Sequence, residues 1–130
     1  MNIVVDTSVI VDFLRTGKGL LVKLLELAGK EHVSLYIPTV VILELWKGRS
    51  MEDAKVEKKV NRILQAMKVV PLSKQLAKDA GILMRRGFIG NFVDSSISAT
   101  SVYLDAQLAT RNRKHFEKVR GLKLFELPKS

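Results

Sequence analysis

The chain has 130 residues, which fits one domain over residues 1–130 with a real hydrophobic core and is too short for two ordinary domains. Its 22 Lys and Arg against 13 Asp and Glu give a formal charge of +9, which favours polyanionic partners such as nucleic acid. The absence of cysteine excludes disulfides and thiolate chemistry, and no apolar run approaches the roughly 18 residues that span a bilayer, so we expect a cytoplasmic protein with no signal peptide and no membrane partner.

Apolar runs and capping residues predict short strands that alternate with helices along the chain. Such an alternation indicates a three-layer α/β sandwich, in which a mostly parallel sheet of four to five strands lies between helices. In chain order the predicted elements are strand 3–5, helices 9–15 and 20–28, strand 33–37, helices 39–46 and 51–67, strand 69–70, a helix capped by Ser73 that reaches residue 83, helix 94–103, strand 107–110, a helical turn 112–116 and strand 122–126.

Three carboxylates interrupt apolar segments of the chain. Asp6 ends the first predicted strand, Glu44 lies within an apolar helix, and Asp94 stands at the start of another helix. An ionised carboxylate in an apolar interior costs several kcal/mol unless it is paired or bound to a metal. Helix capping is an alternative role for Asp6 and Asp94, and an arginine partner or an exposed helix edge is the alternative for Glu44. Taken together, the three favour one shared site.

Carboxylates that share a site repel one another, so a cation is needed if all of them are to stay ionised. Oxygen ligands without histidine or cysteine suit a hard ion, Mg²⁺ or Mn²⁺. Such an ion binds phosphate oxygens and activates water, while a basic surface attracts a phosphate backbone. The residues themselves therefore predict hydrolysis of a phosphodiester bond at a metal site.

Ligands of parallel sheets collect at the carboxyl ends of the strands, where Asp6, Thr110 and Asn112 are expected. Ser8 and Thr110 are candidates to add hydroxyl groups to the site, with capping and strand-end hydrogen bonds as the alternative. Asp12 is expected outside the site, either solvated or ion-paired.

Two further titratable residues also have an expected role outside the chemistry. Asp105 precedes the strand that leads to Thr110 and lies at the other end of that strand, so we expect it in a turn. His115 follows Asn112 in a short helical turn, and we expect it to pack or cap rather than to act as a general base.

The chain carries these residues in a recognisable order. Ile3 to Ile10 reads IVVDTSVI, Glu44 follows in its helix, Asp94 to Thr100 reads DSSISAT, and Leu108 to Phe116 reads LATRNRKHF. This order resembles the PIN-domain family, specifically the small, single-domain VapC-like toxins of prokaryotic toxin–antitoxin pairs. The resemblance covers essentially the whole chain, and it rests on the ordered set rather than on any single motif.

The resemblance implies a Mg²⁺- or Mn²⁺-dependent endoribonuclease. Asp6, Glu44 and Asp94 would hold the metal and orient the attacking water, leaving a 5′-phosphate and a 3′-hydroxyl. Many relatives have a fourth acid where this chain has Asn112, whose carbonyl can reach a metal-bound water but adds no charge. We therefore expect one firmly bound ion before RNA arrives. The resemblance also implies a homodimer and a small antitoxin protein that covers the active site.

Arg111, Arg113 and Lys114 lie beside the predicted site and are the candidates for binding RNA phosphates. Two other functions stay open. The missing fourth acid is compatible with a non-catalytic PIN-like module that binds RNA or protein. A phosphatase with Asp6 as covalent nucleophile is less well supported, because Ser8 stands where that chemistry usually has a second Asp.

Overall fold

Strand β1 (Asn2–Val5) lies at the centre of the sheet in the computed structural model, which describes residues 1–127. It pairs in parallel with β2 (Ser34–Pro38) on one side and with β4 (Gln107–Ala109) on the other. The strands β3 (Lys68–Val70) and β5 (Lys123–Leu124) form the two edges, which gives the order β3-β2-β1-β4-β5 with every pairing parallel. The expected α/β sandwich with its central parallel sheet is confirmed. Residues 128–130 of the expected domain lie outside the described residues.

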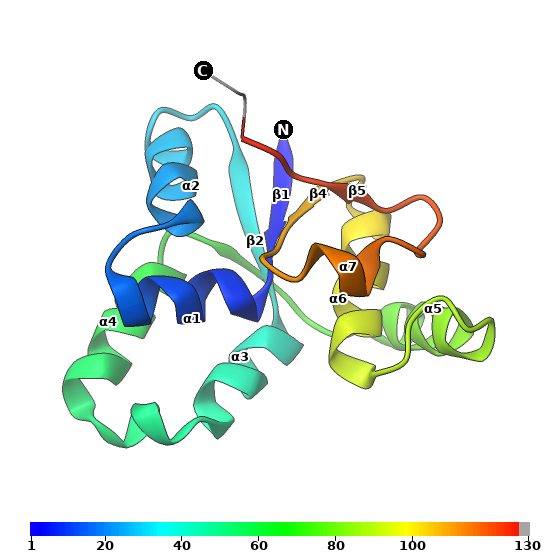
Figure 1. Cartoon of the computed structure of the whole chain (residues 1–130), viewed down its shortest axis with the longest axis horizontal. Coiled ribbons are helices and arrows are strands. Elements are labelled where there is room, and N and C mark those ends of the chain that lie inside the picture. Colours follow the sequence, from blue (N-terminus) through cyan, green and yellow to red (C-terminus); the bar gives the residue numbers. More distant parts are fainter. Residues whose placement is uncertain (128–130) are drawn as a thin grey trace.

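Helices cover both faces of this sheet, as Figure 1 shows. In that view α1, α2 and α4 lie on one side of the strands, and α5 and α6 lie on the other. No helix within residues 1–127 is both long enough and apolar enough to cross a bilayer. The helical segments are α1 (Thr7–Thr16), α2 (Leu20–Gly29), α3 (Thr39–Lys47), the 3-10 turn η1 (Arg49–Glu52), α4 (Ala54–Leu64), α5 (Lys74–Arg85), α6 (Phe92–Tyr103) and α7 (Arg113–Phe116).

The apolar runs of the strands form the core. Ile3, Val4 and Val5 of β1 have no exposed surface, because helices cover the strand on both faces. Leu21 and Leu24 of α2 are also fully buried within this single core. The Leu-rich helix 20–28 thus packs largely against its own domain.

One predicted element is wrong. The expected continuous helix 51–67 is divided into η1 and α4, because Asp53 leaves the helical conformation and its side chain accepts the Lys55 backbone N–H at 2.9 Å. Met51 is buried on η1 and continues the apolar spacing of α4, so the periodicity alone did not mark the break. Helix α4 therefore begins after its own N-cap residue, Asp53, within a segment whose apolar spacing is continuous.

The chain changes direction between the two central strands. It leaves β1 through α1 towards β2, whereas it leaves β4 through α7 towards β5 on the opposite side. The ends of β1 and β4 stay joined, since the Asp6 backbone N–H donates to the Ala109 carbonyl at 3.0 Å. Ligands of open parallel sheets bind at such a switch point, outside the carboxyl ends of the strands.

Candidate active site

A cavity of about 370 Å³ opens at this carboxyl edge of the sheet. Three acids from different elements line it: Asp6 after β1, Glu44 on α3 and Asp94 in the first turn of α6. The predicted residues Ser8 and Asn112 line the same cavity. Its complete lining is Asp6, Thr7, Ser8, Val11, Glu44, Asn91, Asp94, Asn112 and His115.

Asp6 is the most deeply buried acid of the cavity, with 3% of its surface exposed. It occupies the N-cap position of α1, yet its carboxylate makes no capping hydrogen bond. Instead, its Oδ2 atom accepts the Ser8 hydroxyl at 2.7 Å and the Thr110 hydroxyl at 2.6 Å. The capping alternative therefore does not describe this side chain, and the two predicted hydroxyl residues both contact the acid.

The surroundings of Asp6 disfavour its charge. Burial raises the pKa of the Asp6 carboxyl above its ordinary value of 3.8, and the neighbouring Asp94 carboxylate raises it further. The hydrogen bonds from Thr110 and Ser8 lower this pKa, because they stabilise the ionised form, but burial prevails. A cation in the cavity would supply the compensation that the surrounding side chains leave incomplete.

Asp94 is held by the start of its own helix. The Asn91 side chain caps α6 by accepting the Asp94 backbone N–H at 2.7 Å, and it donates in return to Asp94 Oδ2 at 2.8 Å. This reciprocal arrangement makes Asn91, rather than Asp94, the capping residue. His115 Nδ1 lies 3.5 Å from the same Asp94 oxygen. The expectation that His115 only packs or caps is thus corrected, since its ring faces the cavity.

Glu44 and Asn112 complete the predicted set. Glu44 is half-buried and forms no ion pair within residues 1–127, so the arginine partner considered for it is not found there. Asn112 precedes α7 and makes no side-chain capping bond, which leaves its amide oxygen for the cavity. Its backbone N–H donates to the Thr110 hydroxyl at 3.0 Å.

The basic residues beside the cavity differ in their contacts. The Arg111 guanidinium pairs with Asp12 at 3.1 Å, as expected for Asp12 in its ion-paired form. The Arg113 guanidinium pairs with Glu126 at 2.8 Å and also donates to the Phe125 carbonyl at 3.2 Å. These contacts tie both arginines to the protein itself.

Lys114 is the candidate for binding phosphate that has no ion-pair partner in the described residues. It is exposed on α7 and forms no ion pair within residues 1–127. Asp105 lies in the expected turn, with a φ of 49°, and pairs with Lys123 at 3.1 Å.

Sequence reasoning missed three polar residues of the cavity: Thr7, Asn91 and His115. The Asn91 position carried a readable signal, because Asn followed three residues later by an acid is a capping pattern. The Thr7 position carried none, since a Thr after Asp is common at a helix start, whereas His115 was considered in the sequence but expected only to pack or cap.

The cavity fits a hydrated ion better than one bound directly by three acids. No three acidic or histidine side chains within residues 1–127 converge closely enough to share a metal in this arrangement. Mg²⁺ keeps several waters, however, so spaced carboxylates are able to hold it partly through water. The Thr7 hydroxyl is buried without a hydrogen-bond partner in the described residues, and such waters would satisfy it.

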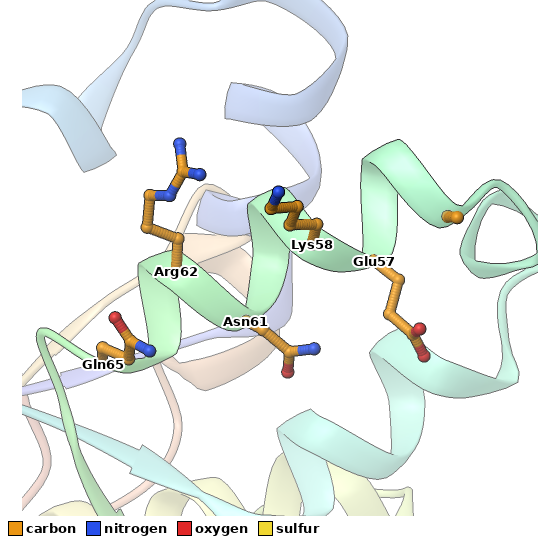
Figure 2. A pocket seen from close by; sticks show the side chains of 6 residues that line it. Glu57, Lys58, Asn61, Arg62 and Gln65 are labelled. Atoms are coloured by element: carbon orange, nitrogen blue, oxygen red, sulfur yellow. The ribbon is translucent and has the colours of Figure 1, made fainter.

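A second hollow of about 370 Å³ lies over the outer face of α4, away from these acids. Figure 2 shows Lys58, Asn61 and Arg62 projecting from this helix, with Glu57 turned towards α3. The Glu57 carboxylate accepts the Trp46 indole N–H at 2.9 Å and so is already engaged. The hollow is formed by exposed side chains of a single helix, and none of the predicted site residues lines it.

Comparisons with known proteins agree with this architecture. The chain is 27% identical over 131 residues to Ribonuclease VapC1 of Methanocaldococcus jannaschii, a match that covers 96% of this chain and 88% of that protein. A chain in the structure of VapBC2 from Rickettsia felis, bound to a DNA fragment from its promoter, superimposes with a TM-score of 0.80 at 22% identity, covering 98% of this chain and all of the other. A chain of DNA-bound VapBC from Salmonella typhimurium gives a TM-score of 0.81 at 18% identity over 96% of this chain and 97% of that one. A family model described as the PIN domain matches residues 3–122, and the chain therefore belongs to the PIN domain family.

Proposed function

We propose that this protein is a Mg²⁺- or Mn²⁺-dependent endoribonuclease that acts in the cytoplasm as the toxin of a toxin–antitoxin pair. The observation that carries the proposal is the buried Asp6 carboxylate, which shares one cavity with Glu44 and Asp94 and has no cationic partner within residues 1–127. The similarity to Ribonuclease VapC1 and the formal charge of +9 support RNA as the substrate.

Asp6, Glu44 and Asp94 would hold the metal ion, with the Asn112 amide oxygen acting through a water molecule. Such an ion would supply charge neutralisation of the phosphate and activation of a water for hydrolysis, and attack of that water with departure of the ribose 3′-oxygen would leave a 5′-phosphate and a 3′-hydroxyl. Ser8 and Thr110 orient the Asp6 carboxylate through their hydrogen bonds. Arg111, Arg113 and Lys114 are the residues that we propose to attract an RNA phosphate beside the cavity.

Cleavage of RNA by the purified protein tests this proposal. We expect cutting with Mg²⁺ or Mn²⁺, its loss on chelation, and a fall of about 100-fold or more in the Asp6→Asn and Asp94→Asn variants. Asp105→Asn is the matched control, because it removes an exposed acid from a turn where Asn also tolerates a positive φ. Full activity in both site variants would refute the assignment.

A non-catalytic module is the second candidate, and one observation favours it. The acids of the cavity do not converge closely enough to share an ion directly within the described residues. A titration with Mn²⁺ separates the two functions. No binding at millimolar Mn²⁺, together with no RNA cleavage, would favour the module.

The antitoxin surface that we propose is an apolar trough of about 490 Å³ between α1, α3 and α4. It shares Val11 and Glu44 with the acidic cavity, so a protein segment that fills it would also reach the acids. Arg15 and Lys59 also line the trough. Val56→Glu is expected to stop binding of an antitoxin protein, measured by co-purification, while leaving RNA cleavage intact.

The homodimer that we propose would use the exposed apolar residues next to the cavity. Leu43 is 65% exposed beside Glu44 in the chain, and Phe92 is 79% exposed beside Asn91. Large apolar side chains that are exposed to solvent are candidates for protein contacts. Light scattering is expected to give the mass of a dimer for the parent and the mass of a monomer for Leu43→Lys. A monomeric parent would exclude the dimer.

A further inference from the structure

We propose that Asp12 is a positioning residue of the active site, acting through its ion pair with Arg111. The pair would hold the turn formed by residues 110–112 against α1, and this turn would fix the hydroxyls that orient Asp6. The inference rests on the proposed nuclease function for its catalytic consequence, but its structural part does not depend on that function.

The two hydroxyls that contact Asp6 are oriented by the backbone of this turn. Ser8 Oγ accepts the Arg111 backbone N–H at 3.0 Å, and Thr110 Oγ1 accepts the Asn112 backbone N–H at 3.0 Å. Each hydroxyl therefore directs its own hydrogen to Asp6 Oδ2, at 2.7 Å and 2.6 Å respectively. A carboxylate oxygen has two lone pairs, so the two hydroxyls fully use Asp6 Oδ2 and leave Oδ1 as the oxygen that no side chain of residues 1–127 engages.

Arg111 is attached to α1 at two points. Its backbone N–H reaches Ser8, and its guanidinium reaches Asp12 Oδ2 at 3.1 Å. Ser8 and Asp12 are four residues apart on α1 and so lie on the same face of that helix. A shift of the Arg111 side chain away from Asp12 would leave the turn held to the first turn of α1 only, through Ser8 and the N-cap residue Asp6.

The turn that follows α1 is shaped around Asp12. A Cβ atom at Gly19 would collide with Asp12 Oδ2, and Gly19 has a φ of +100°, a conformation that other residues rarely adopt. The Asp12 side chain is only 13% exposed, although its guanidinium partner is 55% exposed. The Asp12 carboxylate is therefore mostly buried and enclosed by the turn at Gly19, rather than free in solvent.

The competing interpretation is that Arg111 binds an RNA phosphate and that Asp12 merely neutralises it. The two interpretations predict different kinetics. A positioning pair acts on Asp6, and so it should change the affinity for Mn²⁺ and the value of kcat. A phosphate contact should change KM and the salt dependence of RNA binding instead.

The test compares Asp12→Asn, Arg111→Gln and the double variant with the parent protein. Each single variant is expected to weaken Mn²⁺ binding, measured by calorimetry, about 10-fold and to lower kcat similarly with KM unchanged. The double variant should be no worse than either single one, because both remove the same interaction. Asp105→Asn is the control, since it breaks an ion pair of the same 3.1 Å length far from the cavity and should change none of these values.

Amide hydrogen exchange in metal-free protein gives an independent readout. Faster exchange at Arg111 and Asn112 in the Asp12→Asn variant is expected if the pair holds the turn. Unchanged exchange, Mn²⁺ affinity and kcat would overturn the inference, as would an increase confined to KM. A parent protein that neither binds Mn²⁺ nor cleaves RNA would refute the proposed function, and the exchange rates would still decide the role of the ion pair.

Discussion

Asp6 follows the central strand of the sheet and has 3% of its surface exposed. A carboxylate at this place costs free energy in the metal-free protein, because burial disfavours its ionised form more than Ser8 and Thr110 stabilise it. The same imbalance makes the position suitable for binding a cation. Stability and the proposed function thus make opposite demands on one side chain.

Asp6→Asn is expected to be more stable than the parent at neutral pH without divalent ions. Because the pKa of Asp6 is raised above 3.8, the folded protein binds this proton more tightly than the unfolded chain. This protonation stabilises the parent fully at a pH below the pKa that Asp6 has in the unfolded chain. The stabilisation is lost as the pH rises through the higher pKa that Asp6 has in the folded protein. In urea unfolding experiments, the difference in the free energy of unfolding between Asp6→Asn and the parent should therefore widen from about pH 4 to pH 7.

Addition of Mn²⁺ provides the control for this comparison. The ion should stabilise the parent, because it binds only the folded state, and it should have little effect on Asp6→Asn. A stability difference that is independent of pH would contradict the account of a buried, uncompensated charge.

The sequence predicted six residues of the site because each stands out from its local pattern. Asp6, Glu44 and Asp94 interrupt apolar segments, whereas Ser8, Thr110 and Asn112 follow the predicted strand ends. The contacts of Arg111 were not predictable in this way. Its partner Asp12 is 99 residues away in the chain, and a long exposed side chain has no periodicity that reveals where it points.

Helix α6 carries Asp94, the proposed catalytic acid, in its first turn. Asn91 both caps this helix and donates to Asp94, so one side chain serves the stability of the element and the geometry of the site. Apart from Ile97 and Ala99, the buried positions of α6 are small polar residues, among them Ser95, Ser98 and Ser101, which are fully buried. Such residues allow α6 to approach its neighbours closely.

Two substitutions at Asn91 should separate its roles. Asn91→Ala removes the cap and is expected to lower the free energy of unfolding by about 1 kcal/mol. Asn91→Ser keeps an oxygen for the cap but loses the bond to Asp94, so stability should stay near that of the parent while RNA cleavage falls about 10-fold. Urea unfolding and initial cleavage rates measure the two effects, and equal losses in both properties for both variants would contradict this separation.

The elements themselves were largely predictable from periodicity and capping residues. The strand 3–5 and the helix 20–28 carry clear patterns, and both form close to the predicted bounds. The division between η1 and α4 was not predictable from periodicity, because Met51 and Val60 continue one apolar stripe across Asp53. A cap residue inside an apparently continuous pattern was the available signal.

The whole molecule carries a charge of +9, which attracts RNA over a distance without selecting a sequence. Alternating strands and helices predicted the parallel sheet but not the strand order, which depends on long-range pairing such as Val5 with Ala109. That pairing is what brings the two halves of the site together.

Lys114→Gln is expected to reduce the salt dependence of RNA binding in an inactive Asp6→Asn background. The slope of log K against log salt should fall in magnitude by about 0.7 for the loss of one phosphate contact on single-stranded RNA. Lys30→Gln is the matched control. Lys30 follows α2 and precedes β2, so it lies towards the amino ends of the strands, whereas the cavity lies at their carboxyl ends. Equal effects of the two changes in a filter-binding titration would show a general field rather than a local contact.

Asp6 and Thr110 meet at 2.6 Å although 104 residues separate them. A ribosome delivers the N-terminal part first, so Asp6, Glu44 and Asp94 have all been synthesised before β4. Strand β4 and the turn that follows it are then missing from the nascent chain, and the hydroxyl that orients Asp6 is missing with them. The complete site can assemble only after Thr110 has left the exit tunnel. This late closure would protect the translating ribosome and its messenger from the molecule still being made.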